Sequence, residues 1–204
     1  MNNIRKKFNK YIEDSNQIVC VTCYDASFSK ILEDLKIDIV LVGDSLGMVV
    51  KGENDTHNVT IDEVIYHTSC VAKNKKSFIL MSDMPINSCL NKITALTYAK
   101  KLINVSADIV KIEYRNENRS IIEALVSENI PVCGHLGFLP QYALEKKDIR
   151  IYGKIQSELR KKFEDFLKVK PDGIIFNRKR YNLTEINLQK IKPKEYNRSK
   201  IFNT

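Results

Sequence analysis

The sequence lacks any long hydrophobic run, since no apolar stretch approaches the ~20 residues that a membrane-spanning helix needs. Residues 1–7 are basic, but the hydrophobic segment of a signal peptide does not follow them. We therefore expect no membrane partner and a cytoplasmic location. Hydrophobic residues make up 43% and charged residues 28% of the 204 residues, which is typical of a soluble globular domain with one sizeable core.

The sequence also lacks the cysteine pattern of a disulfide framework or a zinc site. Its five cysteines are an odd number. Cys20 and Cys23 have CxxC spacing, but no second pair accompanies them to complete a zinc site. They fall where a strand is predicted to run into a loop, whereas a redox motif needs a helix N-terminus. We expect reduced cysteines with a structural role.

Basic charge is present without a nucleic-acid-binding signature. The formal net charge is +8, and the lysines are scattered along the chain except for a dense basic run over residues 178–194. Scattered lysines are typical of a general bias in composition rather than of a basic binding face. We therefore expect no nucleic-acid partner.

What the chain does contain is a repeated pattern, in which a short apolar run ends on a carboxylate. The runs are 39–42, 78–82 and 109–112, and the carboxylates that follow are Asp44, Asp83 and Glu113. A nearly continuous apolar run predicts a strand buried on both faces, as in a parallel sheet. In a parallel α/β barrel, the carboxyl ends of the strands form the active site.

Three carboxylates gathered at one end of a barrel would repel one another unless a cation compensated their charge. Oxygen ligands favour a hard divalent ion, which predicts Mg²⁺ before Zn²⁺. The alternative is that each acid is a helix N-cap or a solvated loop residue, because acids commonly follow strands in those roles.

Strands and helices are predicted to alternate six times, which indicates βαβ units with right-handed crossovers. The expected strands are 18–22, 39–42, 78–82, 109–112, 131–135 and 173–176. The expected helices are 3–14, 26–35, 60–73, 92–103, 119–127, 157–168 and 183–191. Asp25 and Thr60 are predicted to cap two of them. We expect one domain over residues 1–192, with a lead-in helix at its start, and a polar tail over residues 193–204.

The chain contains several ordered motifs, which are Thr22-Cys23-Tyr24-Asp25, Leu41-Val42-Gly43-Asp44-Ser45-Leu46-Gly47-Met48, Tyr66-His67-Thr68 and Val132-Cys133-Gly134-His135-Leu136-Gly137. Together they resemble one enzyme family, ketopantoate hydroxymethyltransferase, over about residues 4–140. The resemblance implies a TIM (β/α)8-type barrel of the phosphoenolpyruvate/pyruvate superfamily, of which about six βα units are present. It also implies a cytoplasmic homo-oligomer, usually a decamer.

The resemblance further implies a reaction. A hydroxymethyl group would pass from 5,10-methylenetetrahydrofolate to the keto acid 3-methyl-2-oxobutanoate through an enolate stabilised by Mg²⁺, giving 2-dehydropantoate for pantothenate biosynthesis. The positions that match the family's Mg²⁺ ligands are Asp44, Asp83 and Glu113. The positions that match its contacts to the keto acid are Asp44, Ser45, Asp83, Lys111 and His135. Lys111 and Glu113 share strand parity, so both side chains are expected on one face of their strand.

The sequence departs from the family at the position of the catalytic base. Asn177 stands where the family has a glutamate at the end of the sixth strand, and an amide cannot accept the proton from C3 of the keto acid. A six-stranded sheet would also leave two strand edges open. The transferase is the leading hypothesis. The first alternative is an eroded member that binds Mg²⁺ and keto acid, or only oligomerises, without turnover. The second alternative is a related Mg²⁺-dependent lyase or mutase.

Overall fold

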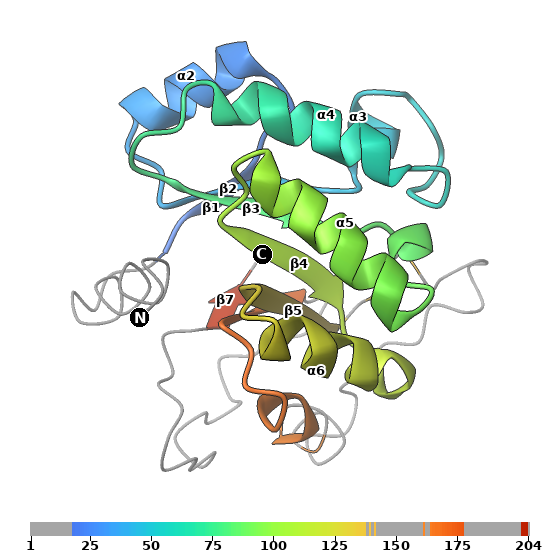
Figure 1. The fold of residues 1–204 in the computed structure, drawn as a ribbon. Helices are drawn as coiled ribbons and strands as arrows, with labels where there is room; N and C mark the ends of the chain where they lie inside the picture. The colour runs from blue at the N-terminus through green and yellow to red at the C-terminus, as the bar shows by residue number, and fades with distance from the viewer. Residues whose placement is uncertain are drawn as a thin grey trace.

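The computed structural model describes residues 18–137, 139, 141, 161, 164–177 and 201–203. Within them, seven strands form one parallel sheet whose strand order equals the chain order (Figure 1). The strands are β1 Cys20–Thr22, β2 Ile39–Val42, β3 Ile79–Asp83, β4 Ile109–Glu113, β5 Val132–Gly137, β6 Gly173–Asn177 and β7 Ile201–Asn203. An all-parallel sheet in sequential order is the arrangement of a βα barrel.

The sheet differs from the sequence-based expectation at its last strand. Six strands were predicted, with residues 193–204 as a polar tail, but β7 lies within that tail and pairs with β6. In addition, Asp83 and Glu113 are the last residues of β3 and β4 rather than the first residues of the loops. The helices expected at 3–14 and 183–191 lie outside the described residues.

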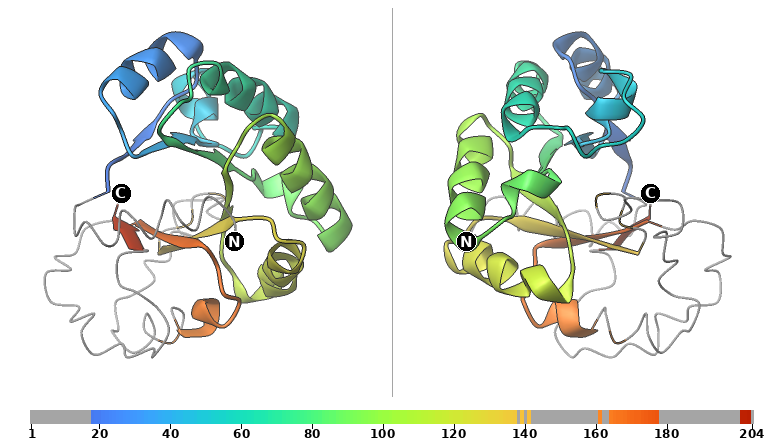
Figure 2. Two further views of the ribbon diagram at one scale, coloured as in Figure 1. Left: turned by 60° about the vertical axis from the view of Figure 1, so that its left-hand side comes forward. Right: turned by 90° about the vertical axis from the view of Figure 1, so that its right-hand side faces the viewer.

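Helices cover the outer face of the curved sheet and lie in the connections between successive strands (Figure 2). They are α2 Ala26–Asp34, the short α3 Leu46–Val49, α4 Ile61–Ala72, α5 Lys92–Asn104 and α6 Arg119–Ser127, with 3-10 turns η1 Ile86–Ser88 and η2 Asn116–Asn118. The Asp25 carboxylate accepts from the Phe28 amide, and Thr60 and Glu63 form a capping box, so both predicted caps are confirmed. Residues 164–167 are also helical.

Alternate residues of strands β2 to β5 point to opposite faces of the sheet, where two apolar cores lie. The larger core lies between the sheet and its helices and includes Val40, Leu80 and Val110. The smaller core fills the inner face of the sheet with Ile39, Leu41, Ile79, Met81, Ile109 and Cys133. Because side chains alternate with period two, the inner face continues toward the carboxyl ends of the strands through Asp83, Lys111 and Glu113. The polar end of the inner face is where a site can form.

Gly134 of β5 makes room for an aromatic ring on the outer face. A Cβ atom at this position would lie 1.9 Å from Cζ of Phe166, a fully buried side chain. The Phe166 ring also packs against Tyr114, with 4.7 Å between ring centroids. A glycine is therefore required for the segment around residues 164–167 to lie directly on the sheet.

All five cysteines lie within residues 18–137, and none of them is in a disulfide bond, as the sequence predicted. Burial raises the pKa of Cys20 to about 11 and that of Cys89 to about 12, so these thiols are protonated and unreactive at neutral pH. Across the part of the chain that the structure describes, no helix is both long enough and apolar enough to span a membrane.

Candidate active site

The register of the sheet brings predicted site residues face to face. Asp83 of β3 is the direct neighbour of Lys111 of β4, and Glu113 of β4 is the direct neighbour of His135 of β5. All four side chains are buried, with at most 6% of each residue exposed. Cross-strand neighbours in one layer lie within contact distance, so the pairing follows from the backbone register.

Asp83 and Lys111 form a buried ion pair at the centre of the site. The Lys111 ammonium donates to Oδ2 of Asp83, and the same oxygen accepts the Asp44 backbone N–H at 3.3 Å. Burial nevertheless raises the pKa of Asp83 to about 7, and the nearby Asp44 charge adds to this effect while Lys111 opposes it. For Lys111, burial works against the charged form, but the three surrounding carboxylates outweigh it and raise its pKa above the ordinary value. Lys111 therefore stays charged.

Glu113 and His135 form the second buried pair. Nδ1 of His135 lies 3.3 Å from Oε1 of Glu113, but the two do not have the geometry of a hydrogen bond. Burial raises the pKa of Glu113 to about 9, with contributions from the charges of Asp83 and Asp44. Burial and the Lys111 charge lower the pKa of His135 well below its ordinary value, so its imidazole is neutral. The pair as it stands has no cation of its own.

Ser45 lies beside the carboxylates and has its own support. Its hydroxyl is 2.7 Å from the Tyr24 hydroxyl, with either group able to donate. The Tyr24 backbone carbonyl in turn lies 2.6 Å from Nδ1 of His67 on α4. Sequence reasoning placed Tyr24 within a family motif but gave it no role, and the structure shows that it orients Ser45.

Gln141 is a buried residue of this site that sequence reasoning missed. Its side-chain amide donates to Oδ2 of Asp44 at 2.8 Å and to the Met84 carbonyl at 3.2 Å. The segment 141–156 was expected to be mostly irregular, and a lone glutamine in such a segment carries no periodic signal. Its only hint was its place four residues after the end of β5, the strand that carries His135.

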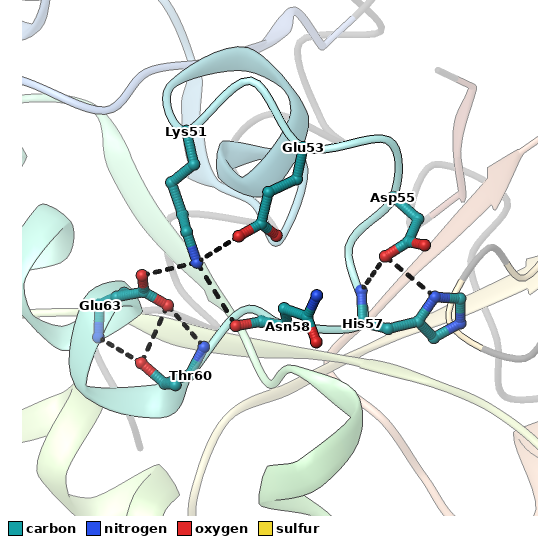
Figure 3. Close-up of polar contacts among 7 residues, drawn as sticks. All are labelled: Lys51, Glu53, Asp55, His57, Asn58, Thr60 and Glu63. Atoms are coloured by element: carbon teal, nitrogen blue, oxygen red, sulfur yellow. Dashed lines mark hydrogen bonds and ion pairs between the residues drawn. The ribbon is translucent and has the colours of Figure 1, made fainter.

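The long loop between β2 and α4, residues 43–60, is held in shape by a network of charged groups (Figure 3). The Lys51 ammonium contacts Glu53 at 2.9 Å, Glu63 at 2.8 Å and the Asn58 carbonyl at 3.4 Å. Gly47 fits because a Cβ atom there would lie 2.8 Å from a Val59 methyl group. A loop fixed in this way holds the residues that follow β2 in place.

Asp55 and His57 form the other part of this loop network (Figure 3). Oδ1 of Asp55 accepts the His57 backbone N–H at 2.9 Å and lies 3.1 Å from Nδ1 of the His57 ring. The opposite ring nitrogen, Nε2, lies 3.1 Å from the Gln141 carbonyl. The loop is thereby connected to the site.

Asn177 is the last residue of β6, where it pairs with Gly137 of β5. Its backbone is at the same carboxyl end of the sheet as Asp83 and Glu113. The match of Asn177 to the family's catalytic base stays a prediction from the sequence.

The chemistry of the carboxylates fits a divalent cation. Among the described residues, no set of three His, Cys, Asp or Glu side chains is already arranged as a metal cage. One oxygen each of Asp44 and Asp83 instead has a protein partner, while Oδ1 of Asp83 and Oε2 of Glu113 are buried without a hydrogen bond. Buried carboxylate oxygens without partners are costly unless a cation joins them.

Known structures share this fold. The chain superimposes with a TM-score of 0.70 on a phosphonopyruvate hydrolase solved with oxalate and Mg²⁺, at 12% identity, covering 90% of this chain and 66% of that one. It superimposes with a TM-score of 0.63 on 2,3-dimethylmalate lyase, a member of the PEP mutase/isocitrate lyase superfamily, at 11% identity, covering 85% and 62%. The likeness confirms the expected TIM-barrel type of fold.

Sequence relatives identify the family. The chain is 38% identical over 166 residues to 3-methyl-2-oxobutanoate hydroxymethyltransferase of Ruthia magnifica, covering 81% of this chain and 64% of that protein. It is 38% identical over 167 residues to the enzyme of the same name from Nitrosospira multiformis, with the same coverage of both chains. The chain thus spans less than two thirds of these relatives. The family model for ketopantoate hydroxymethyltransferase matches residues 3–176, and the chain belongs to this family.

Proposed function

We propose that the chain transfers a hydroxymethyl group from 5,10-methylenetetrahydrofolate to 3-methyl-2-oxobutanoate, giving 2-dehydropantoate for pantothenate biosynthesis. Support comes from the relatives' names and from one observation in particular. Three buried carboxylates surround the Lys111 ammonium at the carboxyl ends of neighbouring strands, and two of their oxygens have no partner. A buried site with surplus negative charge is suited to a cation and an anionic keto acid together.

The proposed metal is Mg²⁺, held by Asp44, Asp83 and Glu113. When bound, it would act as a Lewis acid that favours loss of a proton from C3 of the keto acid. The chain's own contribution is to keep its carboxylates close and its ammonium charged. In the absence of a metal, burial raises the pKa values of Asp83 and Glu113 to about 7 and about 9, so a second cation is needed to keep all three carboxylates ionised.

The keto acid would contact Ser45, Lys111 and His135 in addition to the metal ligands. The Lys111 ammonium supplies a fixed positive charge where negative charge develops on the substrate oxygen. The Ser45 hydroxyl, held by Tyr24, can donate to the substrate carboxylate. Neutral His135 can donate or accept one hydrogen bond without adding charge.

A second candidate function is keto-acid and metal binding without turnover. The observation that favours it is Asn177 at the end of β6, where an amide replaces the family's glutamate. Loss of a positioned general base typically costs about 10²- to 10⁴-fold in rate. We propose slow transfer as the first candidate, because the positions matching the metal and keto-acid contacts are all retained.

The proposal includes a homo-oligomer in the cytoplasm. Support for self-association comes from helix α2 and its C-cap, where Phe28, Ile31 and Leu35 are exposed at 63%, 51% and 66%. Large apolar side chains gathered on one helix face typically mark a surface that another protein covers. Sedimentation of the purified chain measures the oligomeric state.

The test is deuterium exchange at C3 of 3-methyl-2-oxobutanoate in D₂O, followed by proton NMR with and without Mg²⁺. This isolates proton removal from the folate step. Loss of the C3 signal that depends on both Mg²⁺ and the chain supports the transferase. The matched control is Asp83→Asn, which keeps the shape of the site and should exchange no faster than buffer.

Binding of the keto acid without exchange would favour the second candidate, and calorimetry measures that binding on the same sample. Exchange without transfer from the folate donor would show a site that removes the proton but does not complete the reaction. Equal exchange with and without Mg²⁺ would contradict the proposed role of the metal.

A further inference from the structure

We infer that Gln141 is a positioning residue that holds Asp44 in the geometry needed for cation binding; this inference rests on the proposed function. Gln141 is 3% exposed and lies 97 residues from Asp44 in the chain. Its place is between the ends of strands that carry the proposed ligands. Gln141 itself does not coordinate the cation in this proposal.

The side-chain amide of Gln141 is fixed in its plane. An amide nitrogen has two protons to donate, and here it contacts two acceptors, Oδ2 of Asp44 at 2.8 Å and the Met84 carbonyl at 3.2 Å. Met84 directly follows Asp83, the last residue of β3. The contact with the Met84 carbonyl therefore fixes the amide relative to the backbone at the end of β3. The Asp44 carboxylate is thereby tied to a neighbouring strand.

The backbone of Gln141 is fixed as well. Its carbonyl accepts from Nε2 of His57 at 3.1 Å, and its N–H lies near enough to Glu113 to lower the pKa of that carboxyl. His57 is itself held by Asp55 (Figure 3). Gln141 therefore contacts the proposed ligands that follow β2 and end β4. It also contacts the residue that follows β3 and the β2–α4 loop.

These contacts assign different tasks to the two oxygens of Asp44. Oδ2 accepts a charge-assisted hydrogen bond from the amide, which leaves Oδ1 as the oxygen for a cation. Partners of this kind, which orient a ligating carboxylate, typically contribute about 10- to 100-fold to metal affinity. Without the amide, the Asp44 side chain would be free to take other rotamers. The free energy needed to order it would then weaken metal binding.

The experiment is a titration of the full chain with Mn²⁺, followed by electron paramagnetic resonance, for wild type, Gln141→Ala and Gln141→Met. Mn²⁺ reports on sites made of oxygen ligands without requiring turnover. Gln141→Met keeps the length of the buried side chain and removes both donors. We expect the dissociation constant for Mn²⁺ to rise by about 10- to 100-fold in both variants. His57→Ala, which leaves the side-chain amide in place, should have a smaller effect.

The matched control is Asn74→Ala. Asn74 also donates its side-chain amide to a backbone carbonyl, that of Ala26 at 2.7 Å, but it follows α4 at the opposite ends of the strands. We expect its Mn²⁺ affinity to equal that of wild type even where its melting temperature falls as far as that of Gln141→Ala.

An Mn²⁺ affinity of Gln141→Met within about twofold of wild type would overturn the inference. Removing a residue that orients a metal ligand typically lowers metal affinity by more than that. Failure of Gln141→Met to fold would also overturn it, since the residue would then serve the fold rather than Asp44. A wild-type chain that binds no Mn²⁺ would overturn the proposed metal site and this inference with it. Wild-type binding without C3 exchange would count against the proposed reaction alone.

Discussion

Asp83 and Glu63 are both carboxylates in contact with a lysine ammonium, yet their pKa values move in opposite directions. Asp83 touches Lys111 inside the barrel, where its side chain is 1% exposed, and burial raises its pKa to about 7. Glu63 touches Lys51 at 2.8 Å at the surface, where its side chain is 33% exposed. The hydrogen bond from Lys51, with those from Thr60, lowers the pKa of Glu63 to about 2.

The contrast distinguishes an ion pair of the candidate active site, Asp83–Lys111, from an ion pair that stabilises a loop, Glu63–Lys51. In the interior, the cost of removing two charges from water is as large as their attraction, so the Asp83–Lys111 pair adds little net stability. At the surface, solvent keeps that cost small, and the Lys51–Glu63 pair can hold the β2–α4 loop. A buried charged pair that does not stabilise the fold is expected where chemistry requires it.

The largest expected effect tests the buried pair. Lys111→Met leaves the Asp83 carboxylate buried without its cation, which should lower the free energy of unfolding by about 3–5 kcal/mol. Urea unfolding of wild type and variant at the same pH measures the difference. The surface counterpart, Lys51→Met, should have a much smaller effect because solvent surrounds its partners.

A double variant distinguishes the pair's net contribution from the cost of breaking it. Lys111→Met combined with Asp83→Leu replaces the pair by apolar side chains and should recover most of the lost stability. A Lys111→Met variant that loses less than about 1 kcal/mol would mean that Asp83 avoids the cost of a buried charge, by taking up a proton or by hydration.

A smaller effect is expected from metal binding at the same carboxylates. Bound metal is first removed with a chelator. Mg²⁺ added to about 100 times its dissociation constant should then raise the free energy of unfolding by about 2.7 kcal/mol. Thermal unfolding scans with increasing Mg²⁺ measure this, and Asp83→Asn should remove most of the response. Glu63→Gln serves as the surface control and should respond to Mg²⁺ as wild type does. Equal responses from wild type and Asp83→Asn would place the cation elsewhere.

The smallest effect concerns acid and the surface pair. The pKa of Glu63 lies near 2 in the folded chain, below its ordinary value of 4.5. Its stabilising contribution is therefore present above pH 4.5 and is lost as the pH falls from 4.5 toward 2. We expect Glu63→Gln to remove up to about 1 kcal/mol at pH 6 and almost nothing near pH 2.

Urea unfolding at several pH values compares Glu63→Gln with wild type. The matched control is Asp34→Asn on α2, whose partner Lys30 lies 3.8 Å away with both side chains about 70% exposed. That variant should follow wild type at every pH. A Glu63→Gln difference that does not change with pH would show that shape, not charge, sets the contribution of this residue.

The sequence predicted the elements of the fold because their signals are local. Strand β2 was expected at 39–42 and is found there, and the caps at Asp25 and Thr60 follow from short side-chain patterns. Strand β7 was missed because its three residues, Ile201–Asn203, lie in a polar segment and gain their order from β6. Three residues carry too little periodicity to indicate a strand.

The candidate site could be predicted in part for the same reason. Strand parity places Lys111 and Glu113 on one face, which is a property of one strand alone. The pairing of Asp83 with Lys111 depends on how β3 and β4 align, and local sequence does not contain that register. Gln141 was missed because its contact with Asp44 joins residues 97 positions apart in the chain.

The strand order also has a consequence for how this chain is made. Each strand pairs with the strand that precedes it in the chain, so a ribosome delivers each new strand to a partner that already exists. Asp44 and Asp83 emerge before Lys111. A nascent sheet that ends at β3 therefore carries these two acids without their ammonium, until synthesis of β4 supplies it.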